Sequence, residues 1–162
     1  KPIIAMIETP AGLYAARDIA AHPAVVGLFA GTNDLASELR IDLTHGRAGL
    51  SLSLQMMVLA ARASGKAVFD GVNNNLDDMA ALSADALEAK LFGFTGKTAI
   101  HPRQIEPINA VFAPSPAELE DARALVEAAK GGAERFRGRM VESMHVTAAE
   151  VLLSRAAMRQ TT

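Results

Sequence analysis

Short apolar runs alternate with helix-like segments along most of the chain, and this alternation limits the possible folds more than any other feature. The four runs expected to be strands cover residues 3–7, 25–30, 66–69 and 98–100. Segments with helical patterns follow at residues 12–21, 34–39, 50–63, 76–91 and 105–112. Continuous apolar runs of this length are typical of strands buried on both faces of a parallel sheet. A repeat about every 30–40 residues therefore predicts βαβ units.

A parallel sheet of this kind closes in two common ways. The dinucleotide-binding version carries a GxGxxG sequence after a strand, and no strand here is followed by one. The (β/α)₈ TIM barrel has eight strands and is typically ~250 residues long, so four strands make half of it. A half barrel would leave two open edges, which proteins avoid. We therefore expect an α/β fold in which residues 1–113 are the C-terminal half of a TIM barrel whose first half precedes them.

The pattern changes after residue 113. Residues 115–118, Ser-Pro-Ala-Glu, form a capping box with proline at the first helical position. A helix is predicted from this box to about residue 130, with a stop at Gly131 and Gly132. A second amphipathic helix is predicted over residues 147–159. No strand is expected between the two helices. We interpret residues 114–162 as a helical lid or tail outside the barrel repeat.

Composition excludes several classes of protein. The net charge of −2, from 16 basic and 18 acidic residues, gives no basic footprint for nucleic acid. No apolar run reaches the ~18 residues of a membrane span. The absence of cysteine excludes disulfides and thiolate metal sites. With no targeting segment visible, we expect a cytoplasmic protein that binds neither nucleic acid nor a membrane.

Polar side chains follow each expected strand, at the edge where TIM-barrel active sites lie. Glu8 follows the first strand, Asn33 and Asp34 the second, Asp70 the third and His101 the fourth. A carboxylate just beyond a buried strand is costly unless it is paired, hydrogen-bonded or metal-bound. Glu8 and Asp34 come from neighbouring strands and can share Mg²⁺, which prefers one or two carboxylates. The alternative is that both offset the dipoles of helix N-termini.

The amino-acid sequence around these residues resembles that of the citrate lyase β-subunit-like family, which includes malyl-CoA and citramalyl-CoA lyases. The resemblance covers nearly the whole chain and extends through residues 138–142 of the tail. Its most specific part is the Gly-Lys…Ile-His-Pro…Gln block. The matching segments, in order, are Ile-Glu-Thr-Pro-Ala-Gly at residues 7–12, Phe-Ala-Gly-Thr-Asn-Asp-Leu at 29–35, Phe-Asp-Gly-Val at 69–72 and Gly-Phe-Thr-Gly-Lys-Thr-Ala-Ile-His-Pro-Arg-Gln-Ile at 93–105.

The resemblance implies a metal site at the strand ends. Glu8 and Asp34 match the family's two Mg²⁺ ligands, with Mn²⁺ as a possible substitute. The metal would act as a Lewis acid on the carboxylate and carbonyl oxygens of a 2-oxo acid. The backbone of Ala11 and Gly12, at a helix N-terminus, is expected to seat the substrate carboxylate, with Asn33 also in the binding site.

The resemblance also suggests residues for the thioester side and for proton transfer. Lys97 either contacts phosphate of the thioester carrier or is a solvated residue at a strand start. His101 either takes part in binding and catalysis or is a turn residue bonded to backbone. Asp70 matches the family's strand-end aspartate and is a candidate catalytic residue.

Glu142 lies where the family's tail carries an acidic residue, normally Asp, that reaches the active site of a neighbouring subunit. Glutamate is one methylene longer, and a displacement of ~1 Å at a reacting centre can cost ~10²-fold in rate. Three interpretations stay open: the neighbouring backbone compensates, the substrate differs, or Glu142 is surface charge. If Glu142 is not the base, Asp70 is the next candidate.

Together these features imply a Mg²⁺-dependent carbon–carbon lyase, a Claisen-type enzyme acting on a β-hydroxyacyl thioester of CoA or an acyl carrier. Malyl-, citramalyl- and citryl-CoA are candidate substrates, a 2-oxo acid is the second product, and thioester hydrolysis is a variant. The family's tail implies a homotrimer or a hexamer. One rival is a pyruvate-type class II aldolase, which would lack the tail and the Gly-Lys block. Another is a paralogue that binds a thioester or partner without catalysis.

Overall fold

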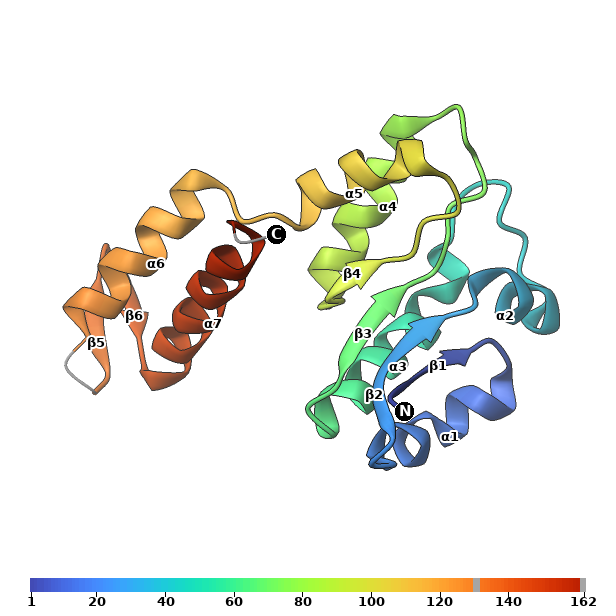
Figure 1. Ribbon diagram of the computed structural model, residues 1–162, viewed down its shortest axis with the longest axis horizontal. Helices are drawn as coiled ribbons and strands as arrows, with labels where there is room; N and C mark the ends of the chain where they lie inside the picture. Colours follow the sequence, from blue (N-terminus) through green and yellow to red (C-terminus); the bar gives the residue numbers. More distant parts are fainter. Residues whose placement is uncertain (130–131, 161–162) are drawn as a thin grey trace. The chain divides into compact units, whose positions relative to one another are not determined.

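The computed structural model describes residues 1–129 and 132–160. It contains two compact units, Lys1–Phe112 and Ala113–Thr162 (Figure 1). The first unit alternates strands with helices, as the sequence predicts. Its elements in order are β1 (Ile3–Ile7), α1 (Pro10–Ala21), β2 (Val25–Ala30), α2 (Thr32–Leu39), η1 (Ala48–Leu50), α3 (Ser51–Ala63), β3 (Ala67–Asp70), α4 (Met79–Phe92), β4 (Gly96–Lys97), η2 (Pro102–Gln104) and α5 (Ile105–Phe112).

The four strands form one parallel sheet in the order β1-β2-β3-β4, which confirms the predicted α/β class with a parallel sheet. Ile7 is in register with Ala30, so β1 and β2 end side by side. Asp70 is in register with Lys97, so β3 and β4 do the same. The side chains that follow these strands therefore share one edge of the sheet.

The core of the first unit lies between the sheet and helices α1 and α3, which pack against each other. Leu28 of β2 and Val68 of β3 are fully buried in it. Strand β1 differs, because Ile3, Ile4 and Met6 are each about half exposed. This part of the sheet is thus well covered at its centre, whereas three apolar side chains of β1 stay half exposed.

The fourth strand lies earlier than the sequence suggests. Residues 98–100 were expected to form it, but β4 consists of Gly96 and Lys97. Thr98 still bonds to β3, because both its backbone N–H and its hydroxyl donate to the Asp70 carbonyl at 3.0 and 2.9 Å. The chain then leaves the sheet and enters the 3₁₀ turn η2.

The second unit contains a β-hairpin that the sequence analysis missed. Its elements are α6 (Pro116–Ala128), β5 (Glu134–Phe136), β6 (Arg139–Val141) and α7 (Ser143–Gln160). The prediction of an all-helical tail is therefore wrong. The hairpin turns at Arg137 and Gly138, both with positive φ. Helix α6 begins with the predicted capping box at Ser115 and Glu118 and ends at Ala128. Of the two glycines predicted to stop it, Gly131 lies outside the described residues.

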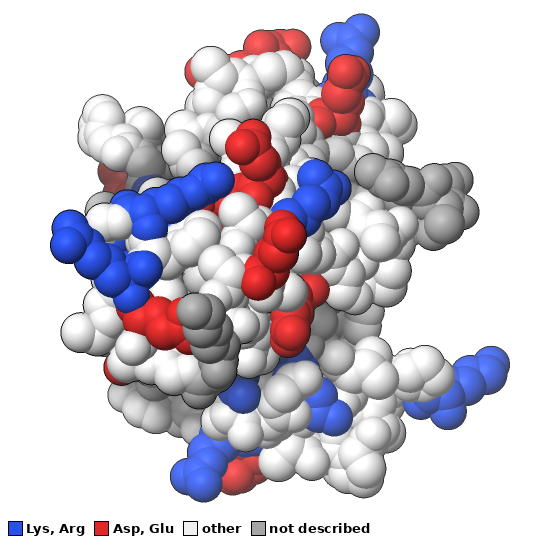
Figure 2. Space-filling view, turned by 90° about the vertical axis from the view of Figure 1, so that its left-hand side faces the viewer, with Lys and Arg blue, Asp and Glu red and all other residues white. Residues whose placement is uncertain are grey.

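The distribution of surface charge and the character of the helices can be compared with the near-neutral net charge and the short apolar runs of the sequence. Figure 2 shows basic and acidic side chains interspersed over the face that it draws. Among the described residues, no helix combines the length and the apolar character that crossing a membrane requires.

Candidate functional site

Glu8 and Asp34 lie where strands β1 and β2 end together. The Gly31 N–H donates to the Ile7 carbonyl at 2.9 Å, which extends the pairing one residue beyond β2. A Cβ added to Gly31 would lie 2.4 Å from Glu8 Cβ and 3.1 Å from Glu8 Oε2. The Glu8 side chain therefore lies directly over the Gly31 backbone, and a residue with a side chain at position 31 would displace it.

The capping alternative does not hold for Glu8. Thr9 caps helix α1, because its hydroxyl accepts the Gly12 N–H at 3.0 Å. Asp34 lies in the first turn of α2, where its charge suits the helix dipole, although it makes no capping hydrogen bond. Neither carboxylate forms a hydrogen bond or ion pair with any residue in the described part of the chain. Both are available to bind a cation.

The donor set around these carboxylates suits a hard cation with few protein ligands. Within residues 1–129 and 132–160 no group of three or more His, Cys, Asp or Glu side chains is arranged to hold a metal. A metal at Glu8 and Asp34 would thus have two carboxylate ligands from these residues, which leaves coordination positions for other oxygen atoms. Mg²⁺ binds proteins in that way.

The start of helix α1 offers one free donor toward this edge. Proline at position 10 has no N–H, and the Gly12 and Leu13 N–H groups both donate to Thr9, to its hydroxyl and its carbonyl. In the described part of the chain the Ala11 N–H has no such partner. In the predicted binding position for the substrate carboxylate, Ala11 therefore offers a free backbone N–H. The Gly12 N–H is already used by the Thr9 cap of α1.

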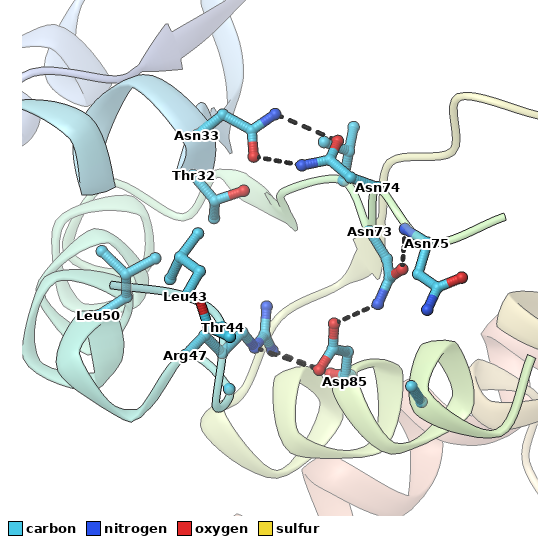
Figure 3. A pocket seen from close by; sticks show the side chains of 13 residues that line it. Thr32, Asn33, Leu43, Thr44, Arg47, Leu50, Asn73, Asn74, Asn75 and Asp85 are labelled. Atoms are coloured by element: carbon cyan, nitrogen blue, oxygen red, sulfur yellow. Dashed lines mark hydrogen bonds and ion pairs between the residues drawn. The ribbon is translucent and has the colours of Figure 1, made fainter. Parts of the chain in front are cut away.

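Asn33 is held by the loop that follows β3. Its amide exchanges two hydrogen bonds with that of Asn74, at 3.2 and 2.8 Å (Figure 3). Both amides line a cavity of about 330 Å³ that Figure 3 shows from close by, with Arg47 and Asp85 on its far side. Asn33 thus fixes the start of α2, which carries Asp34, against the neighbouring loop.

Asp70 is fully buried between two cations. One Arg47 nitrogen, Nη1, lies 2.8 Å from both carboxylate oxygens, and Lys97 Nζ lies 2.7 Å from Oδ2. Lys97 Nζ also donates to the Gly71 carbonyl at 2.6 Å. The Lys97 side chain is 0% exposed. The alternative of a solvated lysine at a strand start is therefore wrong.

Arg47 belongs to this cluster, although the sequence analysis did not single it out. It lies in the loop between α2 and α3 and bonds to Glu88 at 2.6 Å and to the Asp85 carbonyl at 2.9 Å. Burial opposes its charge, but the carboxylates of Asp70, Asp85 and Glu88 outweigh that cost and raise the Arg47 pKa. These partners are 23 to 41 residues away, so no local pattern indicated them.

His101 and Gln104 organise the loop after β4. His101 caps the turn η2, its Nδ1 accepting the Arg103 N–H at 3.1 Å, so the structural alternative for this histidine is observed. The fully buried Gln104 accepts the Ile100 N–H at 2.9 Å and donates to the Asn73 carbonyl at 2.8 Å. Gln104 therefore links the loop after β4 to the loop after β3.

Glu142 lies in the second unit, between strand β6 and helix α7. Its backbone N–H donates to His145 Nδ1 at 3.0 Å, and its carbonyl accepts the His145 N–H at 2.9 Å. Its carboxylate makes no hydrogen bond or ion pair with any residue that the structure describes. It is therefore free to accept a proton.

The chain is similar in fold and sequence to proteins of known structure. The CitE protein of Mycobacterium tuberculosis, solved with magnesium, acetoacetate and coenzyme A, superimposes with a TM-score of 0.83. It is 33% identical, and the match covers 97% of this chain and 61% of that protein.

Sequence comparison gives a consistent result. The chain is 43% identical to a (3S)-malyl-CoA thioesterase of Cereibacter sphaeroides over 96% of its own length and 56% of the relative's. It is 32% identical to the citrate lyase β subunit of Escherichia coli, over 95% of this chain and 53% of that subunit. The chain thus spans about half the length of these curated relatives. Residues 1–102 match the model of one family, and the chain belongs to that family, the HpcH/HpaI aldolase/citrate lyase family.

Proposed function

We propose that these residues form part of a Mg²⁺-dependent carbon–carbon lyase that acts on a β-hydroxyacyl thioester such as malyl-, citramalyl- or citryl-CoA. One observation carries the proposal. Two carboxylates without a protein partner, Glu8 and Asp34, follow adjacent parallel strands. The buried carboxylate of Asp70, two strands along from Glu8, is already neutralised by Arg47 and Lys97. Of these three strand-end carboxylates, Glu8 and Asp34 are free to hold a metal, whereas Asp70 is not.

Glu8 and Asp34 are the residues that would hold Mg²⁺ or Mn²⁺, and Gly31 leaves Glu8 the room it occupies. A bound ion would supply Lewis acidity to the carboxylate and carbonyl oxygens of a 2-oxo acid. The Ala11 N–H, at the positive end of α1, would donate to the substrate carboxylate. Asn33 would present its amide beside it. Magnesium and acetoacetate in the mycobacterial CitE support this assignment.

Asp70 and Lys97 are proposed to support the site structurally, without contacting the substrate. Because both Asp70 oxygens are engaged by cations, we assign Asp70 to positioning the strand ends. Lys97 supports the site through Asp70, since its buried ammonium bonds to Asp70 and Gly71. His101 is assigned to the thioester side, where its Nε2 is the ring nitrogen not used by the turn.

Glu142 is proposed as the base, supplied by the tail of a neighbouring subunit in a homotrimer or hexamer. In cleavage, its carboxylate takes the proton of the substrate hydroxyl. The carbon–carbon bond then breaks as the hydroxyl carbon becomes the carbonyl of the 2-oxo acid. The thioester enolate that leaves takes up a proton at its α-carbon. Glu8 and Asp34 cannot serve as this base while they hold a metal.

A second candidate function is thioester hydrolysis. It is favoured by one observation, the 43% identity to a (3S)-malyl-CoA thioesterase. Hydrolysis would use the same seat for the acid portion of the substrate, but water would attack the thioester carbonyl. The carbon–carbon bond would stay intact.

The products of malyl-CoA distinguish these functions. Full-length protein would be incubated with malyl-CoA in Mg²⁺ or in EDTA, while glyoxylate and free thiol are both measured. A lyase releases glyoxylate with acetyl-CoA and no thiol, whereas a thioesterase releases thiol with malate. For citramalyl- and citryl-CoA, pyruvate and oxaloacetate would be measured in place of glyoxylate. If none of the three thioesters gives a 2-oxo acid or free thiol, the interpretation as a binding paralogue is favoured. Cleavage of a hydroxy acid without a thioester would favour the class II aldolase.

The base assignment has its own test in Glu142→Gln. General base catalysis contributes ~10²–10⁴-fold, so kcat should fall by about that factor while Mg²⁺ affinity stays unchanged. Glu142→Asp should keep much of the activity, because it restores the family's residue. Glu150→Gln, on the exposed face of the same helix, is the matched control. Near-normal turnover of Glu142→Gln would show that the base lies elsewhere.

A further inference from the structure

The start of helix α7 is capped in an unusual way. An N-cap side chain commonly accepts an N–H of the first turn, and in a capping box the third helical residue accepts the N-cap N–H in return. Helix α6 has both halves, from Ser115 and Glu118. At α7, where Glu142 occupies the N-cap position, only the second half is present, and the imidazole of His145 provides it.

This arrangement separates the backbone of Glu142 from its carboxylate. The Glu142 carbonyl accepts the N–H groups of His145 and Val146 at 2.9 and 3.4 Å, which begins the hydrogen-bond ladder of α7. The Glu142 N–H is satisfied by His145 Nδ1 at 3.0 Å. The carboxylate is therefore not consumed in capping its own helix.

The residue before Glu142 fixes it from the other side. Val141 is buried in the small core of the second unit, with Leu125 of α6 and Ala149 of α7. Glu142 is thus held between a buried side chain on one side and an imidazole hydrogen bond on the other. Both contacts restrict the backbone and leave the carboxylate free.

We propose that His145 is a positioning residue for Glu142, which it holds so that the carboxylate points to substrate rather than to its own helix. This inference rests on the proposed function of Glu142 as base. Nδ1 accepts a hydrogen bond, so the ring acts in its neutral form with the proton on Nε2. Without that acceptor, the Glu142 N–H loses its partner. The carboxylate is then drawn back over the positive end of α7.

The test compares two substitutions in the full-length protein. His145→Gln places an amide oxygen at the position where glutamine completes a capping box, so kcat should stay within a few-fold of wild type. His145→Leu removes the acceptor, and a misplacement of ~1 Å predicts a loss of up to ~10²-fold in kcat. KM and Mg²⁺ affinity should not change in either variant. Rescue by glutamine is a result that a merely structural role would not give.

Glu118→Leu is the control for stability, because it breaks the capping box of α6 in the same unit. It should lower the Tm without a comparable loss of kcat. Equal kcat in wild type and His145→Leu would overturn the proposal. Equal losses in His145→Leu and His145→Gln would also overturn it. Full turnover of Glu142→Gln would instead remove the base assignment, and this inference with it, so the two failures are distinguishable.

Discussion

The two free carboxylates differ in how they are held. Glu8 lies on the Gly31 backbone, whereas Asp34 stands in the first turn of a helix. We predict that Glu8→Gln and Asp34→Asn each weaken Mg²⁺ binding by more than the 10–100-fold that loss of a second-shell partner costs. Titration calorimetry measures this, and exposed Asp18→Asn is the control. Unchanged affinity in both variants would remove the metal site from this edge of the sheet.

Asp70 and Lys97 should respond unequally to substitution. Asp70→Asn leaves the Arg47 and Lys97 cations without their shared carboxylate, and breaking a buried pair in this way costs about 3–5 kcal/mol. Lys97→Met leaves Asp70 still paired with Arg47, so we predict a smaller loss. Urea unfolding of the two variants measures both losses. Equal losses would contradict the shared-carboxylate arrangement.

At the residue scale, the sequence predicts which residues follow a strand better than it predicts which side chains pair with one another. Glu8, Asp34 and Asp70 follow strands and were identified by that alone. The state of Lys97 was not predictable, because its partner Asp70 lies 27 residues earlier and only the sheet register brings them together. Arg47 was missed for the same reason, since it joins the cluster from a loop.

At the level of elements, the apolar alternation was sufficient for β1, β2, β3 and their helices. It failed for the β5–β6 hairpin, whose strands have only three residues each. The turn sequence is Arg-Gly and not the Asn-Gly or Asp-Gly that predicts a hairpin. Arg137 there adopts the left-handed conformation, which non-glycine residues seldom adopt. Arg137 pairs with Asp121 and its guanidinium lies 5.3 Å from the Phe136 ring centroid, contacts that sequence alone does not give.

Gln104 connects two elements, so its loss should be felt in both. Gln104→Leu would leave the Ile100 N–H and the Asn73 carbonyl without partners. A fully buried group without a partner costs about 1–3 kcal/mol, whereas these two hydrogen bonds are part-buried and water can replace some of what is lost. We therefore predict a loss of about 1–3 kcal/mol in unfolding free energy for the two together, measured against Gln55→Leu on the exposed face of α3. A loss as small as that of the control would show that the loops do not depend on this amide.

At the scale of the whole molecule, a base supplied in trans can be tested by mixing. Glu142→Ala and Asp34→Asn subunits of the full-length protein should each be inactive alone. Random assortment in a closed homo-oligomer gives roughly one site in four an intact metal pair and an intact tail. Activity should recover to about that fraction when the subunits are mixed and reassembled. Inactive mixed oligomers, verified by light scattering, would mean that each tail serves its own chain.

The placement of Glu8 and Asp34 on two different elements has a consequence for motion. Glu8 follows strand β1, whereas Asp34 lies in the first turn of α2, so an ion held by both would couple the end of β1 to that helix. An ion shared with Asp34 would bind only when β1 is docked, so Mg²⁺ should slow amide hydrogen exchange in β1, by ~100-fold at 100 times Kd. Exchange at Val68 in β3 should change much less. The metal would then restrict the local opening of β1, in addition to its role toward the substrate.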